Sequence, residues 1–445
     1  MSIKNSTIAA AVASAIGATV AGAPSAFATN VSLTQMGSSA VLPVVEQVWH
    51  DYCAAGTLAE YRDATAATFA AWSAGGTNYR VYTCTINTTA TTTAASIAGY
   101  VLTYSQRGTG GSIYGVNPVA TSTAEEIMTT TDGCSNLGAE AANAGYNVAV
   151  ATAFACTSVS TSNTVIPDIG ISDVEPAMFY GAGNPNIDTS KSPPINAPLT
   201  PAQQNNISGT TFIQQVFGVG VGKNVKGSVT NLTSSQIRSI LNGFYTNWSQ
   251  VGGPNQAINI CARTPGSGTQ AGALAIFLSN PCAPTGELGL AASATLNAST
   301  GALIGCLDTT AETNGTGNGY GIGILSLADG PKSGDDFALV SIDGAAANAQ
   351  NAAEGSYTYE VESTINTRNI MTYSTAQQNL INALAGVFSD PNSLATVNSG
   401  LPAAALNALS ANYNPASPYS SASPVEWGTR GGSTCQGYEL LFPNP

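Results

Sequence analysis

One short segment constrains most strongly what this chain folds into. Residues 258–261 form an apolar, strand-like run, residues 263–269 read RTPGSGT, and residues 270–278 have the composition of a helix. A strand that passes through a tight glycine turn into a helix opens an α/β unit. The sequence therefore predicts an α/β fold with a functional loop at the end of this strand.

The same segment predicts one wall of a binding site for a tetrahedral oxyanion. Arg263 offers a planar guanidinium that pairs with two oxygens of one anion. Gly266 and Gly268 let the backbone approach a ligand closely, and a helix N-terminus presents unpaired N–H groups with partial positive charge. Ser267 and Thr269 add hydroxyl donors. The alternative is an ordinary strand–helix turn in which the serine caps the helix.

Similar chemistry recurs earlier in the chain. The sequence reads GSSA at 37–40, between a predicted strand and a predicted helix, and GTGGS at 108–112, after another strand. Arg107 is either a further anion donor or a solvated loop arginine. Asp173 either selects a protonated oxyanion by accepting its proton or caps the next helix. The candidate ligand-binding residues are Ser38, Ser39, Ala40, Arg107, Thr109, Gly110, Ser172, Asp173, Arg263, Ser267, Gly268 and Thr269.

Composition and charge narrow the class of protein. The chain has 445 residues, enough for two or three domains, and only 8% of them are charged. The formal net charge is −13, and the lysines and arginines do not cluster. No nucleic acid and no anionic membrane is therefore expected as a partner, and a bound anion needs short-range donors. No later run reaches the length of a membrane span, so no membrane insertion is expected.

The first 28 residues have the pattern of a secretion signal. Lys4 gives the positive start, residues 8–20 are apolar and rich in alanine, and AFA at 26–28 fits the small-x-small cleavage rule. We expect cleavage after Ala28 and a periplasmic or secreted protein. The alternative is an N-terminal helix of the mature fold.

All eight cysteines follow this signal, which indicates disulfides in an exported chain. Metal binding is the rival interpretation, but no two cysteines are closer than 21 positions and His50 is the one histidine. Short loops suggest the pairs Cys134–Cys156 and Cys282–Cys306, although spacing alone does not assign connectivity. No metal ion and no cofactor are expected. His50 is expected to be an ordinary core or surface histidine and not a catalytic residue.

Strand-like and helix-like pieces alternate along the rest of the chain. Strands are predicted at 31–36, 100–104, 166–171, 212–221, 320–325 and 337–340, and helices at 41–52, 236–241 and 375–387. Thr233 and Ser374 are expected to cap two of these helices. Residues 54–98, rich in alanine and threonine, and the irregular stretch 121–164 are expected to be insertions.

Several segments, in order along residues 30–370, resemble the phosphate-binding members of the type II periplasmic binding proteins, the substrate-binding subunits of phosphate ABC transporters. The matching segments are GSSA at 37–40, GTGG at 108–111, DIGISD at 168–173, LTSSQ at 232–236 with NW at 247–248, RTPGSGT at 263–269 and GIGI at 321–324. Pro265 departs from the family, whose phosphate binders often carry an acidic residue there, and Ala40 replaces a bulky aromatic. The sequence therefore supports a binding site for an oxyanion more strongly than a site specific for phosphate.

The resemblance implies a two-lobed α/β fold, with a hinge and a central ligand cleft. It implies lobe 1 at 29–218, lobe 2 at 219–339, and a return to lobe 1 with a C-terminal tail at 340–445. It also implies that the protein captures inorganic phosphate or a related oxyanion for an ABC permease, without catalysis. Two alternatives stay open: a secreted phosphatase with Asp173 as its base, and an extracellular adhesion or assembly protein that has kept the fold.

Overall fold

The computed structural model describes residues 29–87, 92–140, 148–283, 287–308, 319–331, 335–389, 403–404 and 428–440. The predicted secretion signal, residues 1–28, lies outside them. The α-helices are α1 (Leu42–Tyr52), α2 (Phe69–Ala74), α3 (Asn117–Thr121), α4 (Pro201–Gln204), α5 (Ser234–Leu241), α6 (Gly268–Leu278), α7 (Thr300–Leu307), α8 (Ala349–Ala353) and α9 (Thr375–Ser389). Within the described ranges, no helix combines the length and the apolar character needed to cross a bilayer.

The strands are numbered along the chain in the same way. They are β1 (Asn30–Gly37), β2 (Ala59–Asp63), β3 (Tyr79–Thr85), β4 (Val101–Arg107), β5 (Glu125–Glu126), β6 (Cys134–Gly138), β7 (Thr152–Cys156), β8 (Thr164–Val165), β9 (Ile169–Ser172), β10 (Ile207–Val221), β11 (Asn231–Leu232), β12 (Asn259–Arg263), β13 (Thr295–Asn297), β14 (Gly321–Ser326), β15 (Ala338–Ile342), β16 (Glu360–Arg368), β17 (Ala403–Ala404), β18 (Gly428–Thr429) and β19 (Glu439–Leu440). The predicted helix at 41–52 is confirmed as α1, which begins one residue later, and the predicted strand at 212–221 is confirmed as part of β10. Thr233 and Ser374 cap α5 and α9 as predicted.

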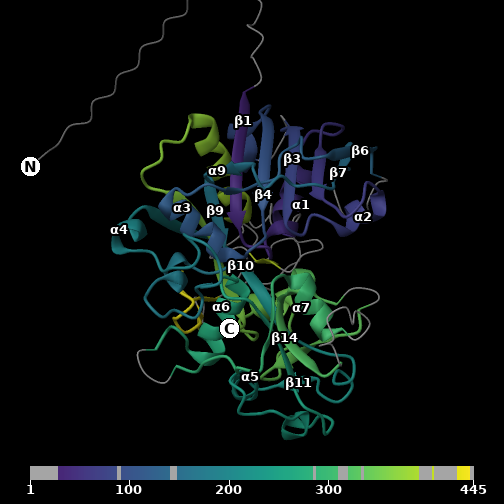
Figure 1. Cartoon of the computed structure of the whole chain (residues 1–445), viewed down its shortest axis with the longest axis vertical. Helices are drawn as coiled ribbons and strands as arrows, with labels where there is room; N and C mark the ends of the chain where they lie inside the picture. The colour runs from purple at the N-terminus through teal and green to yellow at the C-terminus, as the bar shows by residue number, and fades with distance from the viewer. Residues whose placement is uncertain are drawn as a thin grey trace, which may run out of the picture.

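One large mixed sheet runs through the molecule, and β10 joins its two halves. The strand order is β13-β12-β14-β10-β16-β9-β1-β4-β3-β2-β7-β6. The first part of β10 pairs with β16 as far as Val216, and the part from Phe217 pairs with β14. Figure 1 shows β1, β4 and α1 in one half and α5, α7 and β14 in the other, with β10 between them. The predicted mixed α/β fold is confirmed.

Alternation along the strands separates two layers of core around β10. Val219 and Val221 pack in the same buried cluster as α5 and α6, whereas Leu325 of β14 packs with Leu307 of α7. Successive strand residues point to opposite faces of a sheet. The same alternation places Gly220 on the α7 side, where a Cβ would lie 3.0 Å from Leu307. The helices α5 and α6 therefore cover one face of this half and α7 covers the other.

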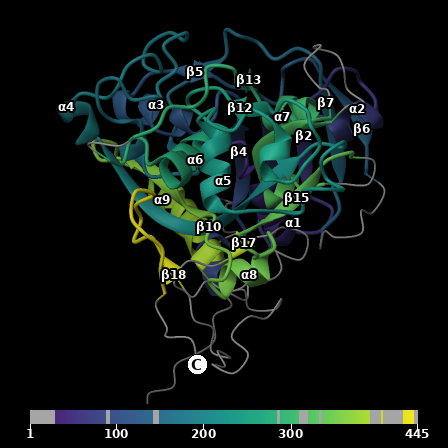
Figure 2. The ribbon, with the colours of Figure 1, turned by 90° about the horizontal axis from the view of Figure 1, so that it is seen from below.

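The other half of the sheet is covered by α1 and α9. Val45 and Trp49 of α1 and Leu380 and Leu384 of α9 belong to one buried cluster with residues of β1 and β4. The C-terminal segment lies beside β10, where the Gln214 side chain donates to the Gly428 carbonyl over 3.0 Å (Figure 2). α1 and α9 therefore cover this half of the sheet, and the C-terminal segment packs beside its strand β10.

The two stretches expected as insertions contribute strands to the large sheet. Residues 54–98 contain β2 and β3, and residues 121–164 contain β6 and β7. β3 pairs with β4, and β2 pairs with β7, so these strands continue the sheet beyond β4. The prediction that 121–164 is irregular was therefore wrong in part, because β6 and β7 are short and their pairing partners are not visible in their own sequence.

Four disulfides link described residues. They are Cys53–Cys84, Cys134–Cys156, Cys261–Cys306 and Cys282–Cys435. The predicted pair Cys134–Cys156 is confirmed, and the predicted pair Cys282–Cys306 was wrong. Cys306 lies on α7, which packs against β12 and so meets Cys261. Packing between elements, and not the length of the intervening chain, sets this connectivity.

Candidate functional site

Strand ends from both halves of the sheet meet at one place. β1, β4 and β9 are parallel to one another, and so are β12, β13 and β14. Ser38, Thr109 and Asp173 follow strands of the first set, and Arg263 ends a strand of the second. Ligands of open α/β sheets bind beyond the carboxyl ends of such strands. The topology therefore brings the main predicted segments to one region.

The loops of the two halves are in direct contact there. The backbone N–H of Ile113 donates to the Gly266 carbonyl over 3.0 Å. Gly111 has a φ of +83°, and a Cβ at this position would lie 2.8 Å from the same carbonyl. Only a glycine gives both the left-handed backbone and the close approach at Gly111.

Asp173 lies at the centre of a buried cluster of hydroxyl and amide groups. Ser38 Oγ donates to Asp173 Oδ1, Gln215 Nε2 donates to the same oxygen over 3.2 Å, and Thr269 Oγ1 donates to Oδ2 over 3.5 Å. The Asp173 N–H donates to Ser112 Oγ over 3.1 Å. Asp173 itself is only 2% exposed. The carboxylate therefore joins β1, β9, β10, α6 and the short helix η2 (Ser112–Gly115).

Burial dominates the electrostatics of this carboxylate. Burial raises the pKa of Asp173, and the hydrogen bonds with Ser38, Gln215 and Ser112 offset this effect only in part. Loss of water favours the neutral form of a carboxyl group. Asp173 therefore holds a proton more readily than an exposed aspartate, which suits a group that accepts the proton of an oxyanion.

Arg263 is a buried cation whose hydrogen bonds go to neutral oxygens. It is 4% exposed, and its guanidinium donates to Asn297 O at 3.3 Å, Thr300 Oγ1 at 2.8 Å and Ala298 O at 3.3 Å. Its pKa is lowered by burial, although Asp173 and Asp329 act in the opposite direction. These bonds use three of its five N–H donors.

Four other buried arginines show a different arrangement, whereas Arg368, also buried, forms no ion pair with a described residue. A glutamate pairs with each of these four, Arg62, Arg80, Arg107 and Arg430. Arg263 forms no such ion pair with any described residue. Asp173 and Asp329 favour the charged form of Arg263, and an anionic ligand that contacts its remaining N–H donors directly would add to that stabilisation.

A cavity of about 210 Å³ opens beside Arg263. Ser39 and Thr109 line it from the first half of the sheet, and Thr300 and Asp329 line it with Arg263 from the second. Two predicted donors, Ser39 and Thr109, therefore share one space with Arg263. The Asp173 cluster packs directly against this region through Ser38, which precedes Ser39 in the chain.

Arg107 and Gly110 flank residues that line the cavity but do not line it themselves. Arg107 pairs with Glu125 over 3.5 Å, and its guanidinium lies 4.2 Å from the ring centre of Tyr114. Gly110 has a φ of +90°, and a Cβ there would lie 2.1 Å from the Tyr114 ring. These contacts show how the second glycine turn is held, and a contact of either residue with a ligand stays a prediction.

Three further candidates have local structural contacts. Ser172 Oγ donates to the Val174 carbonyl over 2.5 Å. Ser267 caps α6 by accepting from the Gln270 N–H, which is the alternative that the sequence left open for this residue. Ala40 is buried in the core, with 2% of its surface exposed. Their side chains therefore shape the loops, and their part in binding remains a prediction.

Gly268 is needed for close packing of α6 against Asp173. A Cβ on Gly268 would lie 2.3 Å from Ser112 Oγ and 2.7 Å from Asp173 Cβ. No side chain fits at such distances without a shift of its neighbours. The N-terminus of α6 and the Asp173 loop therefore approach each other because this position has no side chain.

Sequence reasoning missed several groups at the site. Gln215 lies in the apolar strand β10, and its position next to Gln214 is the one signal that could have marked it. Ser112 ends the GTGGS turn and was a neighbour of predicted residues. Thr300 and Asp329 follow β13 and β14, whose parallel pairing with β12 is not visible in the sequence.

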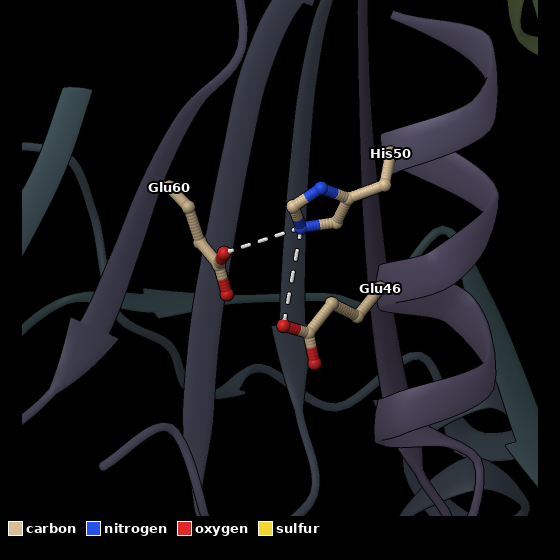
Figure 3. A group of neighbouring side chains, drawn as sticks. All are labelled: Glu46, His50 and Glu60. Carbon is tan, nitrogen blue, oxygen red and sulfur yellow. Dashed lines mark ion pairs between the residues drawn. The ribbon is translucent and has the colours of Figure 1, made fainter. Parts of the chain in front are cut away.

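A second charged cluster lies inside the first half of the sheet. Figure 3 shows Glu46 and His50 of α1 facing Glu60 of β2, and one ligand atom of each lies within 4.8 Å of the others. This geometry resembles that of a metal site. However, Arg62 and Arg80 already pair with these carboxylates, so a further cation would be repelled. The cluster is therefore a buried ion network, and His50 is a core residue.

The residues of this network shift one another's pKa values. Burial lowers the pKa of His50, but Glu60, the Val148 carbonyl and Glu46 outweigh this effect and the pKa is raised. Burial raises the pKa of Glu60, but Arg62, His50 and Arg80 together lower it to about 2. The charged forms of both groups therefore stabilise each other in the fold.

The sequence matches a known family over half of its length. The profile of the family described as a PBP superfamily domain matches residues 202–424. PBP denotes periplasmic binding proteins, a class of α/β binding proteins. This chain belongs to that superfamily. No curated protein sequence matches the chain significantly.

Solved structures with partial likeness include three phosphate-binding or phosphate-transport proteins. A putative phosphate ABC transporter substrate-binding protein from Clostridium perfringens, solved with bound phosphate, has 15% identity and a TM-score of 0.44, and the match covers 80% of this chain and 93% of that one. PstS from Borrelia burgdorferi has 16% identity and a TM-score of 0.36, with 79% and 91% covered. An ABC-type phosphate transport receptor from Vibrio cholerae has 19% identity and a TM-score of 0.35, with 49% and 74% covered.

Proposed function

We propose that this chain is an exported solute-binding protein that captures phosphate or a similar tetrahedral oxyanion between the two halves of its sheet. The halves correspond to lobe 1, at 29–218 and 340–445, and lobe 2, at 219–339. Binding, rather than phosphatase chemistry, is the proposed activity, since hydroxyl groups and the Arg263 guanidinium around one cavity suit the capture of an anion.

The buried guanidinium of Arg263 is the observation that carries this proposal. It lines a cavity with hydroxyl groups from both halves, and its described hydrogen bonds go to neutral oxygens. Its remaining N–H donors suit two oxygens of one anion. Because the chain carries a net charge of −13, these short-range donors must overcome long-range repulsion.

Asp173 supports a protonated anion as the ligand. A hydrogen phosphate or hydrogen arsenate ion can donate its proton to a carboxylate, whereas a fully ionised sulfate cannot. An acidic residue at position 265 would strengthen this selection, but this chain has a proline there. We therefore propose a preference for phosphate and arsenate over sulfate that is moderate in size.

Isothermal titration of the mature chain with phosphate, arsenate and sulfate at pH 7 tests the proposal. We expect heat of binding with phosphate and arsenate, and weaker binding of sulfate. Absence of binding with all three anions would exclude the proposed function. Turnover of a phosphate ester that disappears in Asp173→Asn would instead establish the phosphatase alternative.

Export and delivery to an ABC permease are further parts of the proposal. The pattern of residues 1–28 supports export, and N-terminal sequencing of the protein outside the cytoplasm should begin at Thr29. A mature protein that retains residues 1–28 would overturn the cleavage site. Phosphate uptake that depends on this protein in cells would support delivery to a permease, and unchanged uptake after its loss would count against it.

A further inference from the structure

The cavity beside Arg263 is larger than a free oxyanion requires. Its volume is about 210 Å³. A water molecule has a share of about 30 Å³ in the liquid, so the cavity has room for several water-sized groups. An orthophosphate ion has only four oxygens around one phosphorus. The space therefore accommodates a ligand with an additional group attached to the oxyanion.

The wall of the cavity contains apolar side chains as well as donors. Leu42 and Pro43, at the start of α1, lie on one side, and Ile304 of α7 lies on the other. Free phosphate gains nothing from apolar surface, whereas carbon atoms of a ligand do. Thr77, an exposed residue with a hydroxyl group, also lines the cavity. This combination matches a small organic group that carries polar substituents.

The charges in the cavity also differ from those expected for a bare dianion. Asp329, at the end of the turn after β14, lines the same space as Arg263 and acts electrostatically on it. Arg80 also lines the cavity, but Glu46 pairs with it. A carboxylate repels a phosphate dianion and accepts hydrogen bonds from hydroxyl groups. The cavity therefore offers a cation for an anionic end and an acceptor for a hydroxylated end.

We propose that the natural ligand is a phosphate monoester of a small polyhydroxy compound, which deepens the proposed function and rests on it. The phosphoryl group lies beside Arg263, Ser39 and Thr109. The carbon chain packs between Pro43 and Ile304, and its hydroxyl groups donate to Asp329. Asp329 and the apolar wall thus determine which oxyanion is bound.

Isothermal titration with glycerol 3-phosphate and with inorganic phosphate tests this inference on the mature chain. We expect glycerol 3-phosphate to bind about ten-fold more tightly than inorganic phosphate. Asp329→Asn should weaken the ester and leave inorganic phosphate equal or stronger. Thr77→Trp should fill the cavity and weaken the ester about ten-fold, with a change of less than about two-fold for inorganic phosphate.

Thr230→Trp is the matched control, because Thr230 is exposed and lies outside the cavity. It should change neither affinity. If inorganic phosphate binds more tightly than the ester, or if both cavity variants bind the ester like the wild type, the inference is wrong and oxyanion capture still stands. If neither ligand binds to the folded wild type, the proposed function itself is wrong.

Discussion

At the scale of single residues, burial decides what the charged side chains do. Arg62, Arg80, Arg107 and Arg430 are buried beside glutamates, and each of these pairs satisfies charge within the fold. Arg263 is equally buried but bonds to carbonyl and hydroxyl oxygens. Burying this charge lowers the stability of the fold, and the binding of an anionic ligand by Arg263 would explain why the charge is buried there.

Arg263→Met should therefore separate binding from stability. Phosphate affinity should fall at least about 100-fold, because charge-assisted hydrogen bonds contribute about 1.5–3 kcal/mol each. The free energy of unfolding without ligand should stay equal or rise, because a costly buried charge is removed. Titration calorimetry and urea denaturation measure the two quantities.

Arg238→Met is the control for this change. Arg238 lies half-buried on α5 and does not line the cavity. It should leave phosphate affinity unchanged. Retained affinity in Arg263→Met would show that the buried guanidinium has no part in binding.

At the scale of elements, the approach of α6 to the loop after β9 sets the geometry of the site. Gly268, the first residue of α6, allows this approach because a side chain would collide with Ser112 and Asp173. The contact places Thr269 near Asp173 Oδ2 and Arg263 at the cavity. A shift of α6 would therefore move donors of both clusters.

Gly268→Ala should lower the free energy of unfolding by about 1–3 kcal/mol, as overpacking of a tight contact does. Phosphate binding should weaken with it. Gly301→Ala, in the first turn of α7, is the control for stability, since among the described residues its Cβ would meet only Ser299 Oγ, at 3.9 Å. The control should leave stability equal or raise it by up to about 1 kcal/mol. Equal stability of the two variants in urea denaturation would contradict the packing argument.

The ion network between α1 and β2 predicts a pH dependence of stability. The pKa of His50 is raised in the fold, so its contribution is fully present below pH 6.5 and is lost as the pH rises through the folded value. From pH 6 to pH 9, the free energy of unfolding of the wild type should fall more than that of His50→Gln. Denaturation curves at both pH values measure this, and no other histidine contributes to the difference.

Parallel pH dependence in wild type and His50→Gln would mean that His50 titrates alike in the folded and unfolded states. A wild type that gains more stability than His50→Gln from pH 6 to pH 9 would reverse the sign of the argument. Glu60 acts in a different pH range, because its pKa is lowered to about 2 in the fold. Its contribution to the free energy of unfolding is lost only as the pH falls below the unfolded value of 4.5.

The sequence predicted those elements whose signals are local. The RTPGSGT segment gave the β12–α6 junction, and Thr233 gave the start of α5, because turns and caps depend on neighbouring residues. β2 and β7 were missed because their pairing joins residues 59–63 with 152–156. Gln215 was missed for the same reason, since only the fold brings it to Asp173.

At the scale of the whole molecule, the C-terminal segment ties distant parts together. Glu362 of β16 accepts from the backbone N–H of Arg430 over 2.7 Å, and Glu360 accepts from the Arg430 side chain over 3.0 Å. Cys435 then forms a disulfide with Cys282, which follows α6 in the other half of the sheet. The segment therefore links β16 in the middle of the sheet to the end of α6.

Replacing Cys282 and Cys435 together by serine should lower the free energy of unfolding by about 2–5 kcal/mol, because the unfolded chain gains the freedom of a long loop. The cysteines are 153 positions apart. The matched control replaces Cys134 and Cys156, which are 22 positions apart, and should cost less. Guanidinium denaturation without reductant compares the variants, and an equal or larger loss in the control would refute the role of the long loop.

The central claim is that an oxyanion binds beside the buried Arg263, between the two halves of the sheet. A crystal structure of the mature chain with arsenate, recorded at the arsenic absorption edge, tests it most directly because the anomalous signal locates the anion. We predict one strong arsenic peak within about 4 Å of the Arg263 guanidinium, the distance of a charge-assisted contact, beside Ser39 and Thr109. A fully occupied peak elsewhere, with Arg263 still bonded only to Asn297, Ala298 and Thr300, would contradict the account.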